Sequence, residues 1–175
     1  MNKIISYTVF IIAVTSVVGC KKYLEKEPDN RAKLTDPKKV AQLLGTAYPL
    51  ASYLEFNEAM SDNANDKGQG AIDVTNADSY AFKDVQADDQ DSPENYWSGC
   101  YAAIAAANEA LKACNEAPDP QNYRTQKGEG LVARAYAHFM LVTLFAKPYD
   151  AATASTDPGI PYVTEPETTV FKNRF

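Results

Sequence analysis

The chain has 175 residues, of which 45% are hydrophobic, so it can bury the core of one domain or of part of one. Its 17 Lys and Arg residues are outnumbered by 23 Asp and Glu residues, which gives a formal net charge of -6. This acidic balance excludes the basic footprint of a nucleic-acid-binding protein, so no nucleic acid is expected as a partner.

The first twenty residues carry the pattern of a bacterial lipoprotein signal. Lys3 precedes an apolar run over residues 4–18, and Val-Val-Gly at 17–19 leads into Cys20. Such a run is shorter than the roughly 20 residues of a membrane-spanning helix and has the length of a signal-peptide h-region. The sequence therefore predicts a signal peptide over 1–19, cleavage before Cys20 and attachment of lipid such as palmitate to its sulfur. A plain transmembrane anchor is the alternative.

Residues 20–35 are charged and poor in apolar side chains, so we expect them to form an extended tether. A helix is then predicted from Asp36-Pro37, where a capping side chain precedes a proline in the first turn. Its apolar face consists of Val40, Leu43, Leu44, Ala47 and Tyr48. Pro49 is expected to stop or kink this helix because it has no N–H to donate. A second short helix is predicted over residues 50–60.

Residues 61–91 differ from their surroundings, because Asp, Asn, Gly and Ser dominate and helical periodicity is lost. The one strand-like piece in this stretch is Tyr80-Ala81-Phe82. So long a loop inside a compact domain is uncommon unless it binds a ligand or is disordered. The candidate ligand-binding residues are Asp62, Asn63 and Asp66, and a solvated surface loop is the alternative.

The same loop could in principle bind calcium, because carboxylate and amide oxygens are the usual ligands of this ion. Counted from Asp62, however, Lys67 and Asp73 stand where an EF-hand loop has Gly and a bidentate Glu. No metal site and no cofactor are therefore predicted.

Ser92-Pro93 predicts the start of another helix by the same cap-then-proline pattern. One face of it carries Trp97, Cys100, Tyr101, Ile104, Asn108, Leu111 and Cys114. Asn108 lies inside this apolar stripe and is expected to hydrogen-bond to a neighbour's backbone, because a buried amide must be paired. Trp97 is interpreted as a core residue, with a platform for a sugar ring as the alternative.

Cys100 and Cys114 are predicted to be buried core residues and not a disulfide. On one helix they are about 21 Å apart along its axis, at 1.5 Å per residue, whereas a disulfide needs Cα atoms within about 7 Å. A Cys/His nucleophile is not expected, because no third group that would orient the single histidine can be identified.

A second long helix is predicted after the breaker at 117–122. Residues 131–145 contain few polar side chains, so this helix is expected to be buried between others and antiparallel to the preceding one. Gly128 and Gly130 fit its start or a place where another backbone comes close. Arg134 and His138 are interpreted as a partly buried pair satisfied by a carboxylate such as that of Glu109, with catalysis as the alternative. Residues 151–175 are predicted to be loop and extended chain.

Three segments together resemble the N-terminal part of the SusD/RagB family of outer-membrane nutrient-binding lipoproteins. They are WSGCYAAIAAAN, KGEGLVARAYAHFMLVTLFAKPY and GIPYVTEPET, and the lipobox and charged tether fit the same family. The helix with Arg134, Ala135 and Tyr136 is the most specific part, while Gly130 stands where alanine is expected. The resemblance implies a mainly α fold: a tetratricopeptide-like helical-repeat α-α superhelix fragment with long loops and little β structure. Because family members are several times longer, residues 36–175 are expected to form an incomplete N-terminal SusD-like domain.

The resemblance also implies a function. It indicates a non-enzymatic, lipid-anchored protein on the surface of the outer membrane, which binds an oligosaccharide or another nutrient and delivers it to a TonB-dependent, SusC-like transporter. Three alternatives stay open: a helical-repeat adaptor that binds another envelope protein, a non-functional truncated fragment, and a surface glycoside hydrolase. The last needs two carboxylates facing each other across a pocket.

Overall fold

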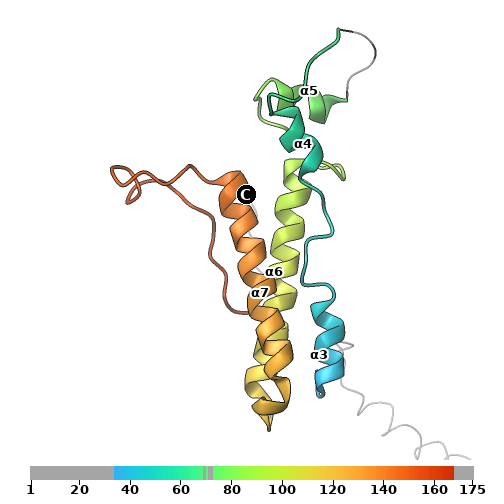
Figure 1. Ribbon diagram of the computed structural model, residues 1–175, viewed down its shortest axis with the longest axis vertical. Coiled ribbons are helices and arrows are strands. Elements are labelled where there is room, and N and C mark those ends of the chain that lie inside the picture. The colour runs from blue at the N-terminus through green and yellow to red at the C-terminus, as the bar shows by residue number, and fades with distance from the viewer. Residues whose placement is uncertain (1–33, 69, 71–72, 168–175) are drawn as a thin grey trace, which may run out of the picture. The chain divides into compact units, whose positions relative to one another are not determined.

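The computed structural model describes residues 34–68, 70 and 73–167. The predicted signal peptide, Cys20 and the tether up to residue 33 lie outside the described residues, so these predictions are not tested by the structure. The helices are α3 (Pro37–Leu44), α4 (Leu54–Ala59), α5 (Val74–Tyr80), α6 (Pro93–Glu116), the short 3-10 helix η1 (Pro120–Tyr123) and α7 (Arg124–Phe145) (Figure 1). The described part of the chain contains no strand, which confirms the mainly α class.

The two long helices, α6 and α7, form the predicted antiparallel hairpin (Figure 1). Ser92 starts α6 as predicted, since its side chain accepts a hydrogen bond from the N–H of Asn95 at 3.1 Å. Small side chains lie between the two helices and are almost fully buried: Ala103, Ala107 and Ala110 of α6, and Ala133 and Ala137 of α7. Because the distance between packed helices depends on the side chains at the contact, these alanines let α6 and α7 approach closely.

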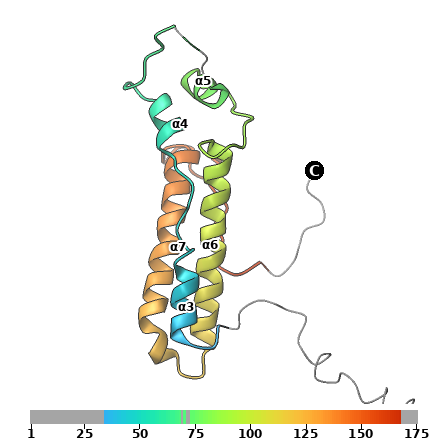
Figure 2. The same cartoon turned by 90° about the vertical axis from the view of Figure 1, so that its right-hand side faces the viewer.

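Helix α3 packs against both members of the hairpin (Figure 2). Asp36 caps it as predicted, accepting a hydrogen bond from the N–H of Lys39 at 3.0 Å. The helix ends at Leu44, however, and not at Pro49 as expected. At this end of the helix the Thr46 hydroxyl donates to the Leu43 carbonyl at 2.7 Å, a side-chain contact that competes with continuation of the helix.

Gly130 marks the place where α3, α6 and α7 meet. Helix α7 begins at Arg124, earlier than predicted, so both Gly128 and Gly130 lie inside it. A Cβ atom on Gly130 would lie 3.1 Å from Cγ of Leu111 and 3.4 Å from Cδ2 of Leu44. The close approach predicted for this glycine is real, although side chains and not a backbone make it.

Besides the core between α3, α6 and α7, a second hydrophobic core lies where α6 and α7 meet the chain around α4. Its buried members are Phe56, Tyr96, Cys100, Ile104, Ala137 and Leu141. Trp97 packs at the edge of this cluster, with its ring centroid 5.2 Å from that of Phe145 in an edge-to-face arrangement, as expected of a core residue.

Both cysteines of α6, Cys100 and Cys114, are buried and free, which confirms the prediction that they form no disulfide. Burial raises the pKa of each thiol, because desolvation disfavours the thiolate. They therefore behave as small apolar core residues and not as nucleophiles.

Helix α7 leaves one face uncovered within the described residues, whereas the sequence predicted that this helix is buried between others. Val132 is 63% and Phe139 61% exposed, and Leu131, Tyr136 and Val142 are also exposed. No helix within the described ranges is both long and apolar enough to cross a membrane.

Candidate ligand-binding site

The acidic stretch at 61–91 contains a helix that the sequence did not predict. Asp73 caps α5 with its carboxylate, which accepts hydrogen bonds from the N–H groups of Thr75 at 2.9 Å and Asn76 at 3.4 Å. The strand predicted at Tyr80–Phe82 is wrong, because Tyr80 ends α5 and Phe82 follows with a positive φ of 52°. Asp73 is a residue type that favours helix N-caps and could have indicated the start of α5, but the Val-Thr-Asn that follows it has low helix propensity.

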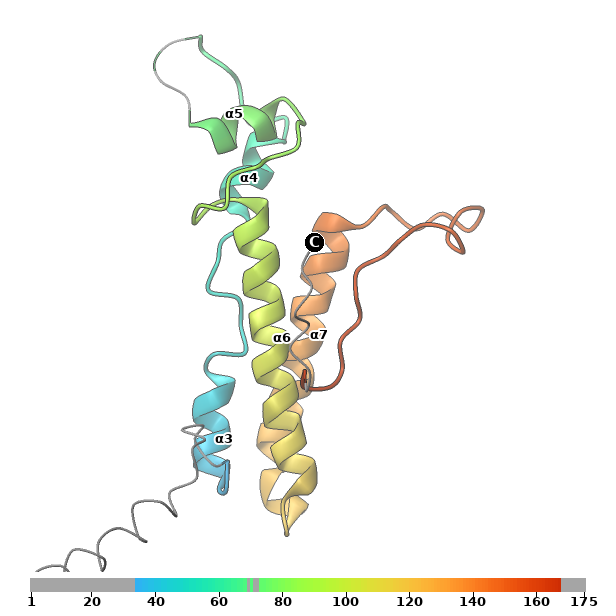
Figure 3. The same ribbon diagram turned by 180° about the vertical axis from the view of Figure 1, so that it is seen from behind.

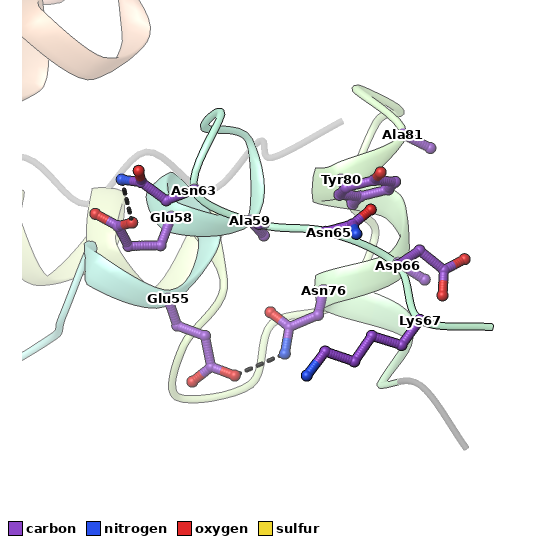
Figure 4. A pocket seen from close by; sticks show the side chains of 12 residues that line it. Glu55, Glu58, Ala59, Asn63, Asn65, Asp66, Lys67, Asn76, Tyr80 and Ala81 are labelled. Carbon is purple, nitrogen blue, oxygen red and sulfur yellow. Dashed lines mark hydrogen bonds between the residues drawn. The ribbon is translucent and has the colours of Figure 1, made fainter. Parts of the chain in front are cut away.

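Helices α4 and α5, together with the chain that leaves α4, surround a pocket of about 640 Å³ (Figure 4). Its polar lining residues are Glu55, Glu58, Asn63, Asn65, Asp66, Lys67, Asn76 and Tyr80. Of the three candidate residues named from the sequence, Asn63 and Asp66 line this pocket. Asp62 is exposed and is not among the lining residues.

Two amide–carboxylate hydrogen bonds fix the polar side chains of the pocket, as the dashed lines of Figure 4 show. Asn76 of α5 donates through Nδ2 to Oε1 of Glu55 on α4 at 2.6 Å, and so ties the two helices together. Asn63 donates through Nδ2 to Oε2 of Glu58 at 3.2 Å. Hydrogen bonds to ionised carboxylates are stronger than neutral ones, so these contacts hold the lining in place before a ligand arrives.

The remaining groups give the pocket its binding chemistry. Oδ1 of Asn76 is buried and has no hydrogen-bond partner among the described residues, and Oδ1 of Asp66 accepts from the N–H of Gly68 at 2.7 Å. Glu55, Glu58 and Asp66 contribute three carboxylates against the single ammonium of Lys67. The lining is thus rich in acceptors, and the half-exposed ring of Tyr80 adds an aromatic face beside them.

A second polar arrangement lies where the chain returns along the hairpin after α7 (Figure 3). We call residues 160–165 the strap. Asn108 donates through Nδ2 to the carbonyl groups of Val163 at 3.3 Å and Glu165 at 3.2 Å, and its Oδ1 accepts from Nη1 of Arg134 at 3.0 Å. The predicted role of Asn108 is therefore confirmed, with the strap as its backbone partner.

Arg134 and His138 also bind the strap, instead of the carboxylate that the sequence predicted as their partner. Nη1 of Arg134 donates to the Thr164 carbonyl at 2.8 Å, and the N–H of Val163 donates to Nε2 of His138 at 3.1 Å. The ion pairs between described residues do not include Arg134, so the expectation of a pair with Glu109 was wrong. The partner of Arg134 is a backbone carbonyl in a segment distant in the sequence, and no residue pattern near Arg134 predicts it.

The described residues form a helical scaffold that carries a polar pocket between α4 and α5. They contain no group of three or more His, Cys, Asp or Glu side chains placed to hold a metal ion. Residues 22–174 match the SusD-like_3 family, described as "Starch-binding associating with outer membrane". The chain belongs to this family, which confirms the resemblance found in the sequence. Comparison with curated proteins and with solved structures gives no match.

Proposed function

We propose that this protein binds a glycan at the outer membrane and that the α4–α5 pocket holds one or more sugar units. The family description supports both the ligand class and the membrane. The observation that carries the assignment of the site is the pocket lining, in which amide and carboxylate acceptors stand beside the ring of Tyr80. Sugar hydroxyls need such acceptors, and the apolar face of a sugar ring packs on an aromatic face.

The dimensions of the pocket fit this role. A volume of about 640 Å³ lies within the range of roughly 300–1,000 Å³ typical of small-molecule sites. The three carboxylates and one ammonium of the lining favour a neutral saccharide, rich in hydroxyl donors, over an anionic one. Starch oligosaccharides are neutral and consist of hydroxyl-bearing rings, so they are suitable probes.

The proposed site is tested by titrating maltoheptaose into the full chain and into three variants. Tyr80→Ala and Asn63→Ala each remove a lining contact, and each is expected to weaken binding about tenfold, the equivalent of 1.4 kcal/mol. Asp62→Ala is the matched control, because Asp62 is exposed and does not line the pocket. Equal effects of all three substitutions, or binding that none of them changes, would reject this site.

We further propose that the protein is anchored by lipid on Cys20, faces the cell exterior and delivers its glycan to a TonB-dependent, SusC-like transporter. The lipobox pattern at 17–20 supports the anchor, and the family description supports the membrane. A Cys20→Ser chain should leave the membrane fraction after a high-salt wash. Its retention there would contradict the lipid anchor without bearing on glycan binding.

A protein-binding role in the envelope is a second candidate, and the exposed face of α7 favours it. Val132 and Phe139 lie one after the other along this face, and exposed apolar patches mark interaction sites. A Phe139→Glu chain that still binds maltoheptaose but no longer cofractionates with a transporter would assign the face to a protein partner. Loss of glycan binding in the same chain would contradict that assignment.

A further inference from the structure

We propose that His138 is a pH-sensitive latch that holds the strap on the α6–α7 hairpin while its imidazole is neutral and releases the strap when the imidazole takes up a proton. The proposal concerns how a surface segment is held, so it does not depend on the glycan site. It rests on the contacts of both ring nitrogens, on the burial of the ring and on the charges around it.

Each ring nitrogen of His138 has one possible role in the docked state. The N–H of Val163 donates to Nε2 at 3.1 Å, so Nε2 must present its lone pair. Nδ1 lies 2.9 Å from the carbonyl oxygen of Arg134, which is an acceptor, so Nδ1 must carry the hydrogen. The docked strap therefore selects a single neutral tautomer of the imidazole.

A proton on Nε2 removes this contact. The new N–H would face the N–H of Val163, placing two donors against each other, and the described residues offer Val163 no other acceptor. His138 is only 5% exposed, and the ring of Tyr162 covers it with the two ring centroids 4.6 Å apart. Water therefore has little access to the imidazole while the strap stays docked.

The groups that surround or bind the strap, with their charges, come from three segments. On α7, Arg134 lies one turn before His138 and carries a positive charge. From α6, Asn108 is uncharged, and burial raises the pKa of the Tyr101 phenol, so that group stays neutral in the acid range. The strap contributes the phenol of Tyr162 and the exposed carboxylate of Glu165.

His138 differs from the other groups that hold the strap. Tyr101 donates from its hydroxyl to the Pro161 carbonyl at 2.9 Å, and Asn108 and Arg134 likewise donate to strap carbonyls. Among these four described residues, His138 is the one that accepts a hydrogen bond from the strap. Histidine is also the one of these four residue types whose side chain normally titrates between pH 5 and 8. Because a protonated Nε2 cannot accept the N–H of Val163, the contact exists only while the imidazole is neutral.

Release of the strap would reshape a second hollow on the hairpin. Thr164, Glu165 and Pro166 form one wall of a hollow of about 430 Å³, whose other walls include Asn108 and Arg134. The latch therefore couples the proton concentration around the protein to the shape of this part of its surface.

The test is amide hydrogen exchange of the full chain, measured by NMR at pH 7.5 and pH 5.0 and expressed as protection factors, which remove the intrinsic pH dependence of exchange. The protection of the Val163 amide is expected to fall at least tenfold on acidification, while that of Ala107 inside α6 changes less than twofold. In a His138→Gln chain the side-chain oxygen can still accept from Val163 but does not titrate. Val163 should then stay protected at both pH values.

Two results would overturn the proposal: constant protection of Val163 in the wild-type chain, or the same pH-dependent fall in the His138→Gln chain. If that variant does not fold, the wild-type chain still decides. The ¹⁵N shifts of the imidazole and of the Val163 amide are followed over the same pH range. A shared midpoint supports the latch, and separate midpoints contradict it.

Discussion

The two glycines of α7 allow a matched test of how α3, α6 and α7 pack. Alanine is about 1 kcal/mol more favourable than glycine inside a helix, so both Gly128→Ala and Gly130→Ala gain this amount from the backbone. At Gly128 nothing lies within 4 Å of the new Cβ, and the gain is kept. At Gly130 the Cβ would meet Cγ and Cδ2 of Leu111 at 3.1 and 3.2 Å. Overpacking a core typically costs about 1–3 kcal/mol.

We therefore expect Gly128→Ala to raise the free energy of unfolding by about 1 kcal/mol and Gly130→Ala to leave it unchanged or lower it by up to about 2 kcal/mol. The assay is urea denaturation followed by far-ultraviolet circular dichroism, with unchanged m-values as the sign that the comparison is valid. Equal stabilisation by the two substitutions would refute the packing of Leu111 and Leu44 against α7.

Three further predictions follow from buried or paired groups. In a Cys20→Ser chain, Cys100 and Cys114 should not react with Ellman's reagent until the protein is unfolded, because both thiols are buried and their pKa values raised; fast reaction in the native state would contradict this. Asn108→Asp should free the strap, because a carboxylate cannot donate to two carbonyls; a strap as resistant to proteolysis as in the wild-type chain would count against it. The pKa of Asp157 is lowered by hydrogen bonds from the Thr153 hydroxyl and from Lys147. The loop that these contacts close should therefore open as the pH falls below about 4, which amide exchange would show. The Asp157→Asn substitution should abolish this pH dependence.

Features set by neighbouring residues could be predicted from the sequence. Asp36-Pro37 and Ser92-Pro93 each combine a side-chain cap with a proline in the first turn, and both start helices where expected. The apolar stripe of α6 and the nearly polar-free stretch of α7 were enough to predict an antiparallel hairpin. Asn108 stood out because an amide within an apolar stripe needs a partner, whatever that partner is.

Features set by distant residues could not be predicted. The partner of Arg134 is the carbonyl of Thr164, and nothing near Arg134 in the sequence indicates it. Helix α5 has poor intrinsic propensity and is held by contacts of Thr75 with Asp89 and of Asn76 with Glu55. The pocket depends on this helix, so the sequence could indicate Asn63 and Asp66 but not the opposite wall that Asn76 and Tyr80 supply.

The most direct test of the proposed glycan site is to map maltoheptaose on the full chain by NMR. The amides of Asn63, Asn76 and Tyr80 around the α4–α5 pocket are expected to shift in proportion to the bound fraction, while those of Val132 and Phe139 on the exposed face of α7 stay unchanged. Shifts confined to the α7 face, or no shift at a millimolar concentration of maltoheptaose, would contradict the account.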